Sequence, residues 1–379
     1  MLINKNYIIQ KSFEFIKEQQ KYNYSSKANA DKLYVIKNRF PKWLRSIIFH
    51  PFNPAYSIFL QYKATRNKGN FINFEALQPF SVDFLQYYLA NDFEFDSSLY
   101  YPTQDDVEIE SFICNRIKSL IPGYSKVEKT KEQIEMFKKR DKLKENAKRD
   151  KGGYVLELDN ENYYLPSNIF QEHTYIHEYG LKYLPDYVKE YIAGKDFFDI
   201  GAFMGDTSIL LERKYKPNHI YAYEPVGANL KYLEQTIEHN APTKITAVKK
   251  GVGDVETTLD IYIDPTNLSS CSINESIANN LLAKETVSIT TLDKECEGRT
   301  VGLIKMDIEG AEYSAIKGGL ETIKRDKPVL LISLYHTAKD FFEIPPMLKE
   351  AVPDYLFRFI NIEIGNPFSE KILIAYPKQ

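Results

Sequence analysis

The chain has 379 residues, a length that favours two domains over one. With 43% hydrophobic and 27% charged residues, its composition is that of an ordinary folded protein and excludes disorder and a membrane-embedded chain. The formal net charge of −3 argues against nucleic acid as a partner, because nucleic-acid binders usually carry a strong basic excess. Cys114, Cys271 and Cys296 are widely spaced and contain no CxxC pair, so we expect neither a disulfide framework nor a zinc site.

No apolar run of signal-peptide or transmembrane length is visible. Charged side chains interrupt the apolar residues of the first twenty positions, at Lys11, Glu14, Lys17 and Glu18. Elsewhere no 18 uncharged apolar residues follow one another. We therefore expect a cytoplasmic protein with no transmembrane segment.

Residues 1–125 are rich in aromatic side chains and predict a mainly helical region. Ile9, Phe13 and Ile16 recur at helical spacing, which predicts one buried helix face. The aromatic and basic stretch 33–60 contains three prolines and favours the core of a small helical domain, with a membrane or partner surface as the alternative. We expect this region to shape the acceptor site or to form a homodimer contact.

Residues 126–153 differ from their surroundings in charge. Between positions 126 and 151 there are eleven basic and six acidic residues. This pattern predicts a solvated helical linker that ends at Gly152 and Gly153, with a basic surface for an anionic substrate as the less favoured reading. The expected domains are thus 1–125, the linker 126–153, and 154–379, with a cofactor core from residue 195.

After residue 154, short apolar runs alternate with helical patterns, which predicts a mostly parallel sheet built from right-handed crossovers. The expected parallel strands are 197–200, 220–224, 245–248, 301–307 and 329–335, with an extra strand at 259–263. The expected helices are Thr207–Tyr215, Ala228–His239 and Glu312–Arg325. Runs 355–362 and 371–377 predict an antiparallel closing hairpin, so the sheet should contain seven main strands.

The sharpest motif is Asp199–Ser208, which reads DIGAFMGDTS. Gly201 and Gly205 predict a tight turn after the first strand, where a Cβ would keep the backbone away from a bound cofactor. Asp206 and Thr207 predict the N-cap of the next helix. That helix N-terminus would present free N–H groups to an anionic part of the cofactor.

The turn does not fit the dinucleotide fingerprint GxGxxG. Counted from Gly201, the fingerprint requires glycines where this chain has Phe203 and Asp206. A nicotinamide-dependent oxidoreductase is therefore disfavoured.

Two further segments complete the predicted nucleoside site. Glu224 follows the second strand, 23 positions after Gly201, where its carboxylate can accept hydrogen bonds from both ribose hydroxyls. The loop at 251–254 predicts an adenine contact, with a simple turn as the alternative.

The third motif, KMDIEGAE at 305–312, ends the fourth strand. Parallel sheets bind ligands at the carboxyl ends of their strands, so Asp307 and Glu309 should face the reacting group. Glu312 is assigned to capping the next helix through its dipole. At the end of the fifth strand, His336 can accept a proton from a hydroxyl near neutral pH, which makes it the candidate base, with Asp307 orienting either the imidazole or the substrate hydroxyl.

With these motifs the chain resembles the FkbM family of S-adenosylmethionine-dependent methyltransferases. The resemblance covers about half the chain and extends through SITTLD at 288–293, IKGG at 316–319, and LLISLYH with its downstream helix and PDYLF text. It departs from many relatives at Ser333, where they carry a carboxylate. The resemblance implies a class I methyltransferase fold, S-adenosyl-L-methionine as cofactor and S-adenosyl-L-homocysteine as product.

The predicted function is O-methylation of a hydroxyl group, as on a sugar of a bacterial surface glycan or glycoconjugate, or on a natural product. A scaffold that binds the cofactor for a glycan-assembly partner is the alternative from another class. The predicted catalytic residues are His336, Asp307 and Glu309, and no metal ligand is predicted, although carboxylates can hold a divalent cation. The predicted cofactor contacts are Asp199, Gly201, Ala202, Gly205, Asp206, Thr207, Glu224, Pro225, Gly253, Asp254 and Asp307.

Overall fold

The computed structural model describes residues 2–15, 71–73, 79–91, 94–100, 104–119, 126–150, 152–241, 244–263, 271–272, 283–363 and 366–379. The aromatic and basic stretch predicted at 33–60 lies outside these residues. The chain divides into two compact units that interleave in sequence. The larger unit contains Met1–Leu2, Phe95–Phe112 and Phe137–Gln379, and the smaller contains Ile3–Glu94 and Ile113–Met136. The predicted domain boundaries stay predictions.

The described N-terminal residues are mainly helical, as expected. They contain the short strands β1 (Leu2–Asn4), β2 (Phe71–Asn73), β3 (Glu94–Asp96) and β4 (Lys126–Glu128), helical residues 5–15, helices α4 (Pro79–Ala90) and α5 (Gln104–Ser119), and the 3-10 turn η1 (Ser97–Leu99). The predicted buried face of the first helix is wrong, because Ile9 and Phe13 are 47% and 60% exposed. Ile8 and Phe15 are buried instead, two turns apart on another face. Among the described helices, none has the length and apolar content to cross a membrane.

The charged stretch after residue 126 is not one helix. Helix α6 spans Lys131–Asn146, and the chain then enters a three-stranded antiparallel sheet made of β5 (Lys148–Asp150), β6 (Gly153–Leu158) and β7 (Glu161–Leu165). Gly152 has φ +84° and makes the turn from β5 to β6. The glycine pair therefore forms a hairpin turn rather than a helix end, because Lys148–Asp150 pair with the next strand.

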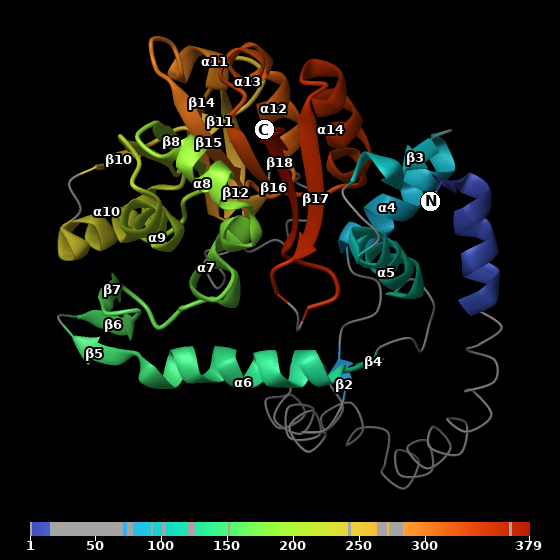
Figure 1. Ribbon diagram of the computed structural model, residues 1–379, viewed down its shortest axis with the longest axis horizontal. Coiled ribbons are helices and arrows are strands. Elements are labelled where there is room, and N and C mark those ends of the chain that lie inside the picture. Colours follow the sequence, from blue (N-terminus) through green and yellow to red (C-terminus); the bar gives the residue numbers. More distant parts are fainter. Residues whose placement is uncertain are drawn as a thin grey trace, which may run out of the picture. The chain divides into compact units, whose positions relative to one another are not determined.

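A seven-stranded sheet forms the centre of the larger unit and confirms the predicted fold class (Figure 1). Its order is β10-β9-β8-β15-β16-β18-β17, in which the first five strands are parallel and β18 is antiparallel to both neighbours. The strands are β8 (Asp196–Ile200), β9 (Ile220–Tyr223), β10 (Ile245–Val248), β15 (Val301–Met306), β16 (Val329–Ser333), β17 (Tyr355–Asn361) and β18 (Lys371–Pro377). Since every residue of β8, β15 and β16 is buried, these central strands are covered on both faces.

Helices cover the two faces of this sheet. They are α7 (Glu172–Tyr175), α8 (Asp186–Ile192), α9 (Asp206–Tyr215), α10 (Gly227–Asn240), α11 (Leu292–Glu295), α12 (Glu312–Lys317), α13 (Leu320–Asp326) and α14 (Ala338–Ala351), with the 3-10 segment η2 (Glu178–Tyr183). Alternate residues of the central strands, such as Phe197 and Leu303, share one core cluster with Ile209 of α9 and Leu233 of α10. Figure 1 shows α9 beside α10, and α12, α13 and α14 gathered at the top.

Two predicted elements differ from the structure. The helix predicted over Glu312–Arg325 is broken into α12 and α13, because the chain passes tightly against the loop after β11 at Gly318. A Cβ on Gly318 would lie 2.2 Å from the carbonyl oxygen of Gly253. The extra strand, β12 (Thr257–Ile263), belongs to a separate four-stranded sheet with β11 (Gly251–Val252), β13 (Cys271–Ser272) and β14 (Ala283–Thr290).

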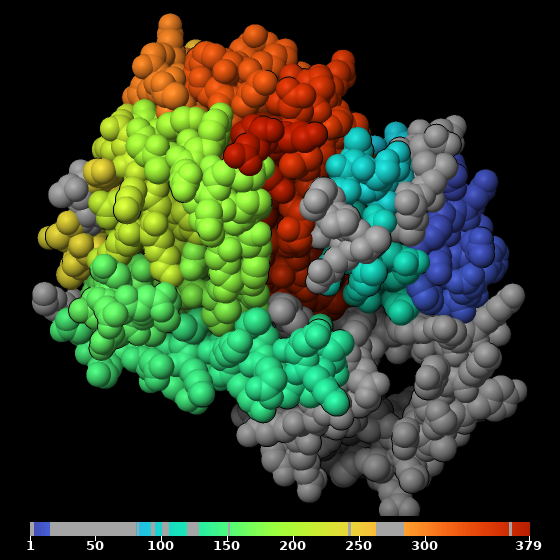
Figure 2. Space-filling model, viewed as in Figure 1, coloured from blue at the N-terminus to red at the C-terminus, as the bar shows by residue number. Residues whose placement is uncertain are grey.

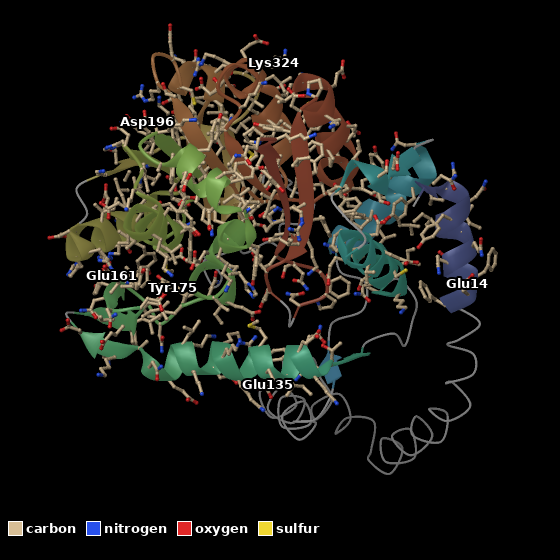
Figure 3. All side chains as sticks on the ribbon, in the orientation of Figure 1. Glu14, Glu135, Glu161, Tyr175, Asp196 and Lys324 are labelled. Atoms are coloured by element: carbon tan, nitrogen blue, oxygen red, sulfur yellow. The ribbon has the colours of Figure 1, made fainter. Side chains whose placement is uncertain are left out.

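A segment far upstream completes the core of the larger unit beside the C-terminal hairpin. The ring of Phe112 lies 5.2 Å from that of Phe341 in α14 and 6.0 Å from that of Phe359 in β17. Phe95 stacks on Phe341 with 5.2 Å between the ring centroids. On the opposite side of the core, Tyr175, labelled in Figure 3, packs against two further aromatic rings.

Candidate active site

The glycine turn after β8 lies against the end of β15. Gly201 has φ +79°, and a Cβ there would lie 1.9 Å from the carbonyl oxygen of Asp307. The N–H groups of Gly201 and Ala202 both donate to the carbonyl of Tyr223 at the end of β9. Only glycine allows this backbone contact, so the turn joins the ends of three neighbouring strands.

Asp199 lies just before this turn, and its side chain is fully buried. One carboxylate oxygen lies 3.1 Å from Lys305 Nζ, and the other accepts a 2.6 Å hydrogen bond from the Ser208 hydroxyl. Lys305 also donates to the carbonyl of Gly201 at 2.7 Å. Burial lowers the pKa of Lys305, but Asp199 and Asp307 outweigh it, so the pKa is raised and the ammonium stays charged. Because Asp199 is fully buried, we expect it to affect cofactor binding indirectly, by stabilising the glycine turn.

The start of α9 differs from the prediction. Gly205, in the left-handed conformation with φ +82°, occupies the position before the helix, and no side chain caps the helix there. Asp206 is the first helical residue, and its carboxylate accepts a 2.7 Å hydrogen bond from Thr174. Thr207 is buried next to the same threonine. The predicted N-cap role of Asp206 and Thr207 is wrong, because the helix begins one residue earlier than an N-cap at Asp206 requires.

Glu224 directly follows β9, at the carboxyl end where it was expected. Its carboxylate accepts hydrogen bonds from the N–H groups of Phe203, at 3.0 Å, and Val226, at 2.9 Å. Only 4% of the residue is exposed. Burial raises the pKa of Glu224 to about 7, against the opposing effect of these hydrogen bonds. Oε1 also accepts a 3.5 Å hydrogen bond from Asn229, so Oε2 is the oxygen with a second lone pair for a ligand hydroxyl.

The remaining predicted nucleoside contacts lie along the same rim. Pro225 is half-buried after Glu224, and its ring is within 4 Å of the Cβ position of Gly251. Gly253 donates to the carbonyl of Thr290. Asp254 is tied to α12, since its carboxylate accepts hydrogen bonds from Ser314 and Lys317.

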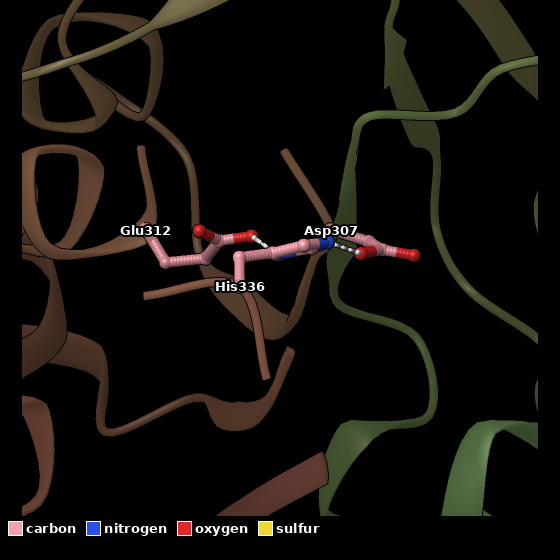
Figure 4. A group of neighbouring side chains, drawn as sticks. All are labelled: Asp307, Glu312 and His336. Atoms are coloured by element: carbon pink, nitrogen blue, oxygen red, sulfur yellow. Dashed lines mark hydrogen bonds and ion pairs between the residues drawn. The ribbon is translucent and has the colours of Figure 1, made fainter. Parts of the chain in front are cut away.

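Four titratable side chains meet at the ends of β15 and β16. His336 Nδ1 is 2.9 Å from a carboxylate oxygen of Glu312, and its Nε2 is 3.7 Å from Asp307 and 3.6 Å from Glu309. Figure 4 shows His336 between Glu312 and Asp307. The side chain of His336 is only 1% exposed, whereas those of Asp307 and Glu309 are 22% and 32% exposed. The two carboxylates are thus the groups that a ligand can reach.

Glu312 does more than the predicted capping role. Its carboxylate accepts hydrogen bonds from the N–H groups of Ile308 and Gly310, both at 2.8 Å, so it fixes the loop before α12. It also contacts His336 more closely than Asp307 does. Glu312, rather than Asp307, is therefore the main orienting partner of the imidazole.

The charges in this group shift the pKa values in opposite directions. Burial lowers the pKa of His336, but the carboxylates of Glu312 and Glu309 outweigh it and raise the pKa to about 10. Burial raises the pKa of Glu309 to about 7. Burial also opposes ionisation of Asp307, but His336 and Lys305 keep its pKa below the usual range. At neutral pH the imidazole is protonated, which is inconsistent with its predicted role as the resting base.

Asp307, Glu312 and His336 each offer one ligand atom within 4.8 Å of the others, a grouping that resembles a cation site. However, the closest pair, Glu312 and His336 Nδ1, already share a hydrogen bond. Both oxygens of Glu312 also accept backbone hydrogen bonds. These contacts use the atoms that a cation would need, so the proposed mechanism contains no metal.

Further polar residues at this rim come mostly from segments that no sequence motif indicated. Tyr179 of η2 donates to Asp307 at 2.8 Å, across 128 positions of sequence. Tyr335 lies 3.3 Å from both Asp307 and Glu370, and Glu370 lies 3.4 Å from His173. Figure 2 shows the segment around η2 and α8 in green against the red C-terminal hairpin. Lys305 and Tyr335 carried a usable signal, since Lys305 lies two residues before Asp307 in the third motif and Tyr335 directly precedes His336 after the fifth strand.

The fold and the rim at the ends of β8, β9, β15 and β16 define a class I methyltransferase domain. Residues 199–359 match the family model described as the methyltransferase FkbM domain. This part of the chain is an FkbM methyltransferase domain, as the motifs predicted. No curated protein matches the chain in sequence.

Solved structures of methyltransferases are similar to this chain. Methyltransferase FkbM from Methylobacillus flagellatus KT has 24% identity and a TM-score of 0.39, over 48% of this chain and 44% of that one. The tRNA (uracil-54, C5)-methyltransferase of Pyrococcus abyssi, solved with S-adenosyl-L-homocysteine, has 12% identity and a TM-score of 0.33, over 60% and 44%. TYW2 of M. jannaschii, solved with AdoMet, has 12% identity and a TM-score of 0.33, over 60% and 87%. The chain thus spans less than half the length of the first two.

Proposed function

We propose that this chain is an S-adenosyl-L-methionine-dependent O-methyltransferase that acts on a hydroxyl group, as on a sugar of a surface glycan or glycoconjugate. The observation that carries the proposal is the contact between the glycine turn and Asp307. It supports the proposal because the glycine turn, which we assign to the cofactor, lies directly beside a pair of reachable carboxylates. Such carboxylates can bind an acceptor hydroxyl and take its proton.

The residues fit the two ends of the cofactor. Oε2 of Glu224 keeps a lone pair for a ribose hydroxyl, at the end of the strand next to the turn. The first turn of α9 offers backbone N–H groups for a carboxylate, and Asp206 adds a negative charge for an ammonium group. The amino-acid end of the cofactor carries both a carboxylate and an ammonium group, so it matches these two features of the chain.

The proposed chemistry transfers a methyl group to oxygen. When bound, the cofactor supplies a methyl group on a positively charged sulfur. Glu309 would accept the proton of the acceptor hydroxyl as its oxygen takes the methyl group, and the rest of the cofactor would leave as a neutral thioether. Asp307, held by Tyr179, orients the hydroxyl, and protonated His336 limits the repulsion between the two carboxylates.

The experiment is a methyl-transfer screen. The purified protein is incubated with cofactor that carries a deuterated methyl group, and neutral, amino and acidic glycosides are tested as acceptors. Mass spectrometry should find the label on an oxygen of a glycoside, and calorimetry should show binding of S-adenosyl-L-homocysteine. No binding of either cofactor form would refute the proposal.

The same screen separates an enzyme from a cofactor-binding scaffold. A scaffold would bind S-adenosyl-L-homocysteine but transfer no label to any acceptor, and the Glu309→Gln variant would behave in the same way. An enzyme should lose transfer in Glu309→Gln while keeping the cofactor affinity of the wild type.

A further inference from the structure

A second group of polar side chains lies next to Asp307, and two of its members fall outside residues 199–359. His173 belongs to α7, and Glu370 immediately precedes β18. One oxygen of Glu370 is 3.4 Å from His173 Nδ1, and the other is 3.3 Å from the hydroxyl of Tyr335. That hydroxyl is also 3.3 Å from Asp307. A single phenol therefore joins the carboxylate of the proposed reaction to a carboxylate from the C-terminal hairpin.

The backbone is strained where these side chains converge. Glu370, Glu309 and Tyr179 all have positive φ values, of 56°, 57° and 51°. For a residue with a Cβ, this left-handed conformation costs about 1 kcal/mol or more. All three side chains point to the surroundings of Asp307, since Tyr179 donates to it and the other two carboxylates flank it. Strain that gathers around one group of atoms is typical of ligand-binding sites.

Glu370 retains acceptor capacity on the side of His173. Its oxygen there is buried and has no hydrogen-bond partner among the described residues. Its 3.4 Å contact with His173 is an ion pair without hydrogen-bond geometry, and each of the two side chains is 12% exposed. A buried carboxylate oxygen without a donor is costly, so a ligand that donates to it would be bound favourably.

We infer that Glu370 and His173 form a specificity-determining pair that binds a second hydroxyl of the acceptor, next to the hydroxyl that is methylated. This inference rests on the proposed methyl transfer to oxygen and names its substrate class as a neutral vicinal diol. The hydroxyl of Tyr335 donates to Asp307 and Glu370, so His173 is the donor for the ligand and the two carboxylates are its acceptors. A hydroxyl uses both kinds of partner, while an ammonium group can only donate.

The charge of the site also disfavours anionic acceptors. Asp307, Glu309 and Glu370 surround the position proposed for the diol, so a phosphate or carboxylate beside the reacting hydroxyl would face like charges. Both residues of the pair lie outside the segment that matches the family model.

The test measures binding and transfer with the full chain loaded with S-adenosyl-L-homocysteine. The probes are the methyl glycosides of glucose, galactose, mannose and rhamnose, each with its monodeoxy counterparts. Their binding is measured by saturation-transfer NMR. The variants are His173→Gln and Glu370→Gln. Matched controls are His239→Gln, an exposed histidine, and Asp354→Asn, whose carboxylate is 75% exposed.

In the wild type, removal of one of two neighbouring hydroxyls should weaken binding by about tenfold or more, as expected for lost hydrogen bonds to charged groups. This preference should disappear in Glu370→Gln and His173→Gln and persist in both controls. With labelled cofactor, the variants should lose the diol preference in KM more than in kcat.

Three results would overturn the inference. They are failure of all four glycosides to bind the loaded wild type, an unchanged diol preference in Glu370→Gln, and preferential methylation of an amine. Failure of the proposed function itself would look different, because S-adenosyl-L-homocysteine would then not bind to the wild type in calorimetry.

Discussion

His336 and Glu309 lie 3.6 Å apart, yet their pKa values move in ways that reverse their expected roles. The imidazole is enclosed by carboxylates and stays protonated to about pH 10, whereas burial raises the pKa of Glu309 to about 7. A base should have a pKa near the working pH and should be reachable by its substrate. Glu309 meets both conditions, and His336 meets neither.

The first prediction concerns the pH dependence of turnover. The kcat of the wild type should rise as pH increases through about 7, because Glu309 then loses its proton. Glu309→Gln should lower kcat by about 10²- to 10⁴-fold and remove this rise. Glu321→Gln, whose side chain is 78% exposed, serves as the control. A rise centred near pH 10 would instead identify His336 as the base.

The second prediction concerns Glu224. Its carboxylate accepts hydrogen bonds better when ionised than when protonated, so affinity for S-adenosyl-L-homocysteine should increase as pH rises through about 7. Glu224→Gln should weaken binding by about 1.5–3 kcal/mol and flatten the pH dependence. Calorimetry at several pH values measures both effects, with exposed Glu297→Gln as the control. Equal affinities for wild type and Glu224→Gln would exclude the ribose role.

The third prediction concerns the pair of His336 and Glu312. Because the folded pKa of His336 is raised from 6.5 to about 10, its stabilisation is present in full below pH 6.5 and is lost as pH rises through about 10. Glu312→Gln leaves a buried imidazolium without its main partner and should lower the free energy of unfolding by about 3 kcal/mol near pH 7. Urea unfolding should show this difference shrinking between pH 7 and 10. A difference independent of pH would contradict the ion pair.

At the scale of the elements, the site depends on backbone contacts that leave no room for a Cβ. The turn after β8 meets the end of β15 at Gly201, and the break between α12 and α13 meets the loop after β11 at Gly318. In both places a carbonyl oxygen occupies the space of a side chain. These contacts set how the strand ends sit relative to one another, and thereby the position of Asp307.

The fourth prediction compares two glycines with similar backbone conformations. Gly201 and Gly298 have φ values of +79° and +71°, but only Gly201 has a neighbouring atom in the way of a Cβ. Gly298→Ala should cost about 1 kcal/mol of stability, from the left-handed conformation alone. Gly201→Ala should cost about 1–3 kcal/mol more and also weaken cofactor binding. Equal losses in urea unfolding would mean that the contact with Asp307 is unimportant.

Sequence patterns predicted the elements that depend on local periodicity and could not predict those set by distant contacts. The strands of the main sheet and the closing hairpin followed from apolar runs such as FFDI before Gly201. The break at Gly318 and the hairpin turn at Gly152 depend on tertiary neighbours, which a pattern does not contain. Likewise, nothing near Tyr179 or Glu370 in sequence indicates that both side chains reach the surroundings of Asp307.

At the scale of the whole molecule, the larger compact unit contains residues that lie far upstream of residue 154 in the sequence. Phe95–Phe112 belongs to the larger unit and packs on the last helix and the closing hairpin. Tyr100 forms a bridge with Phe357 of β17. A cut at the boundary predicted from composition, residue 125, would remove these rings and expose the apolar surface beneath them.

The fifth prediction tests this upstream segment on a single helix. Phe112→Ala should lower the free energy of unfolding by about 3–5 kcal/mol, because the residue is 1% exposed and its ring contacts two others. Val107→Ala, on the same helix but 64% exposed, should change stability by less than about 0.5 kcal/mol. Thermal unfolding measures both. Similar small losses would show that the segment is dispensable for the fold.

The left-handed residues around Asp307 also bear on how this protein can change under selection. Glycine or asparagine at positions 309 and 370 would relieve the backbone and gain stability, but would remove a carboxylate from the reaction or from acceptor choice. Selection for heat resistance alone should therefore favour loss of these acids. Selection that also requires a particular acceptor should keep both, and new acceptor preferences should arise first at position 370, away from the proton transfer.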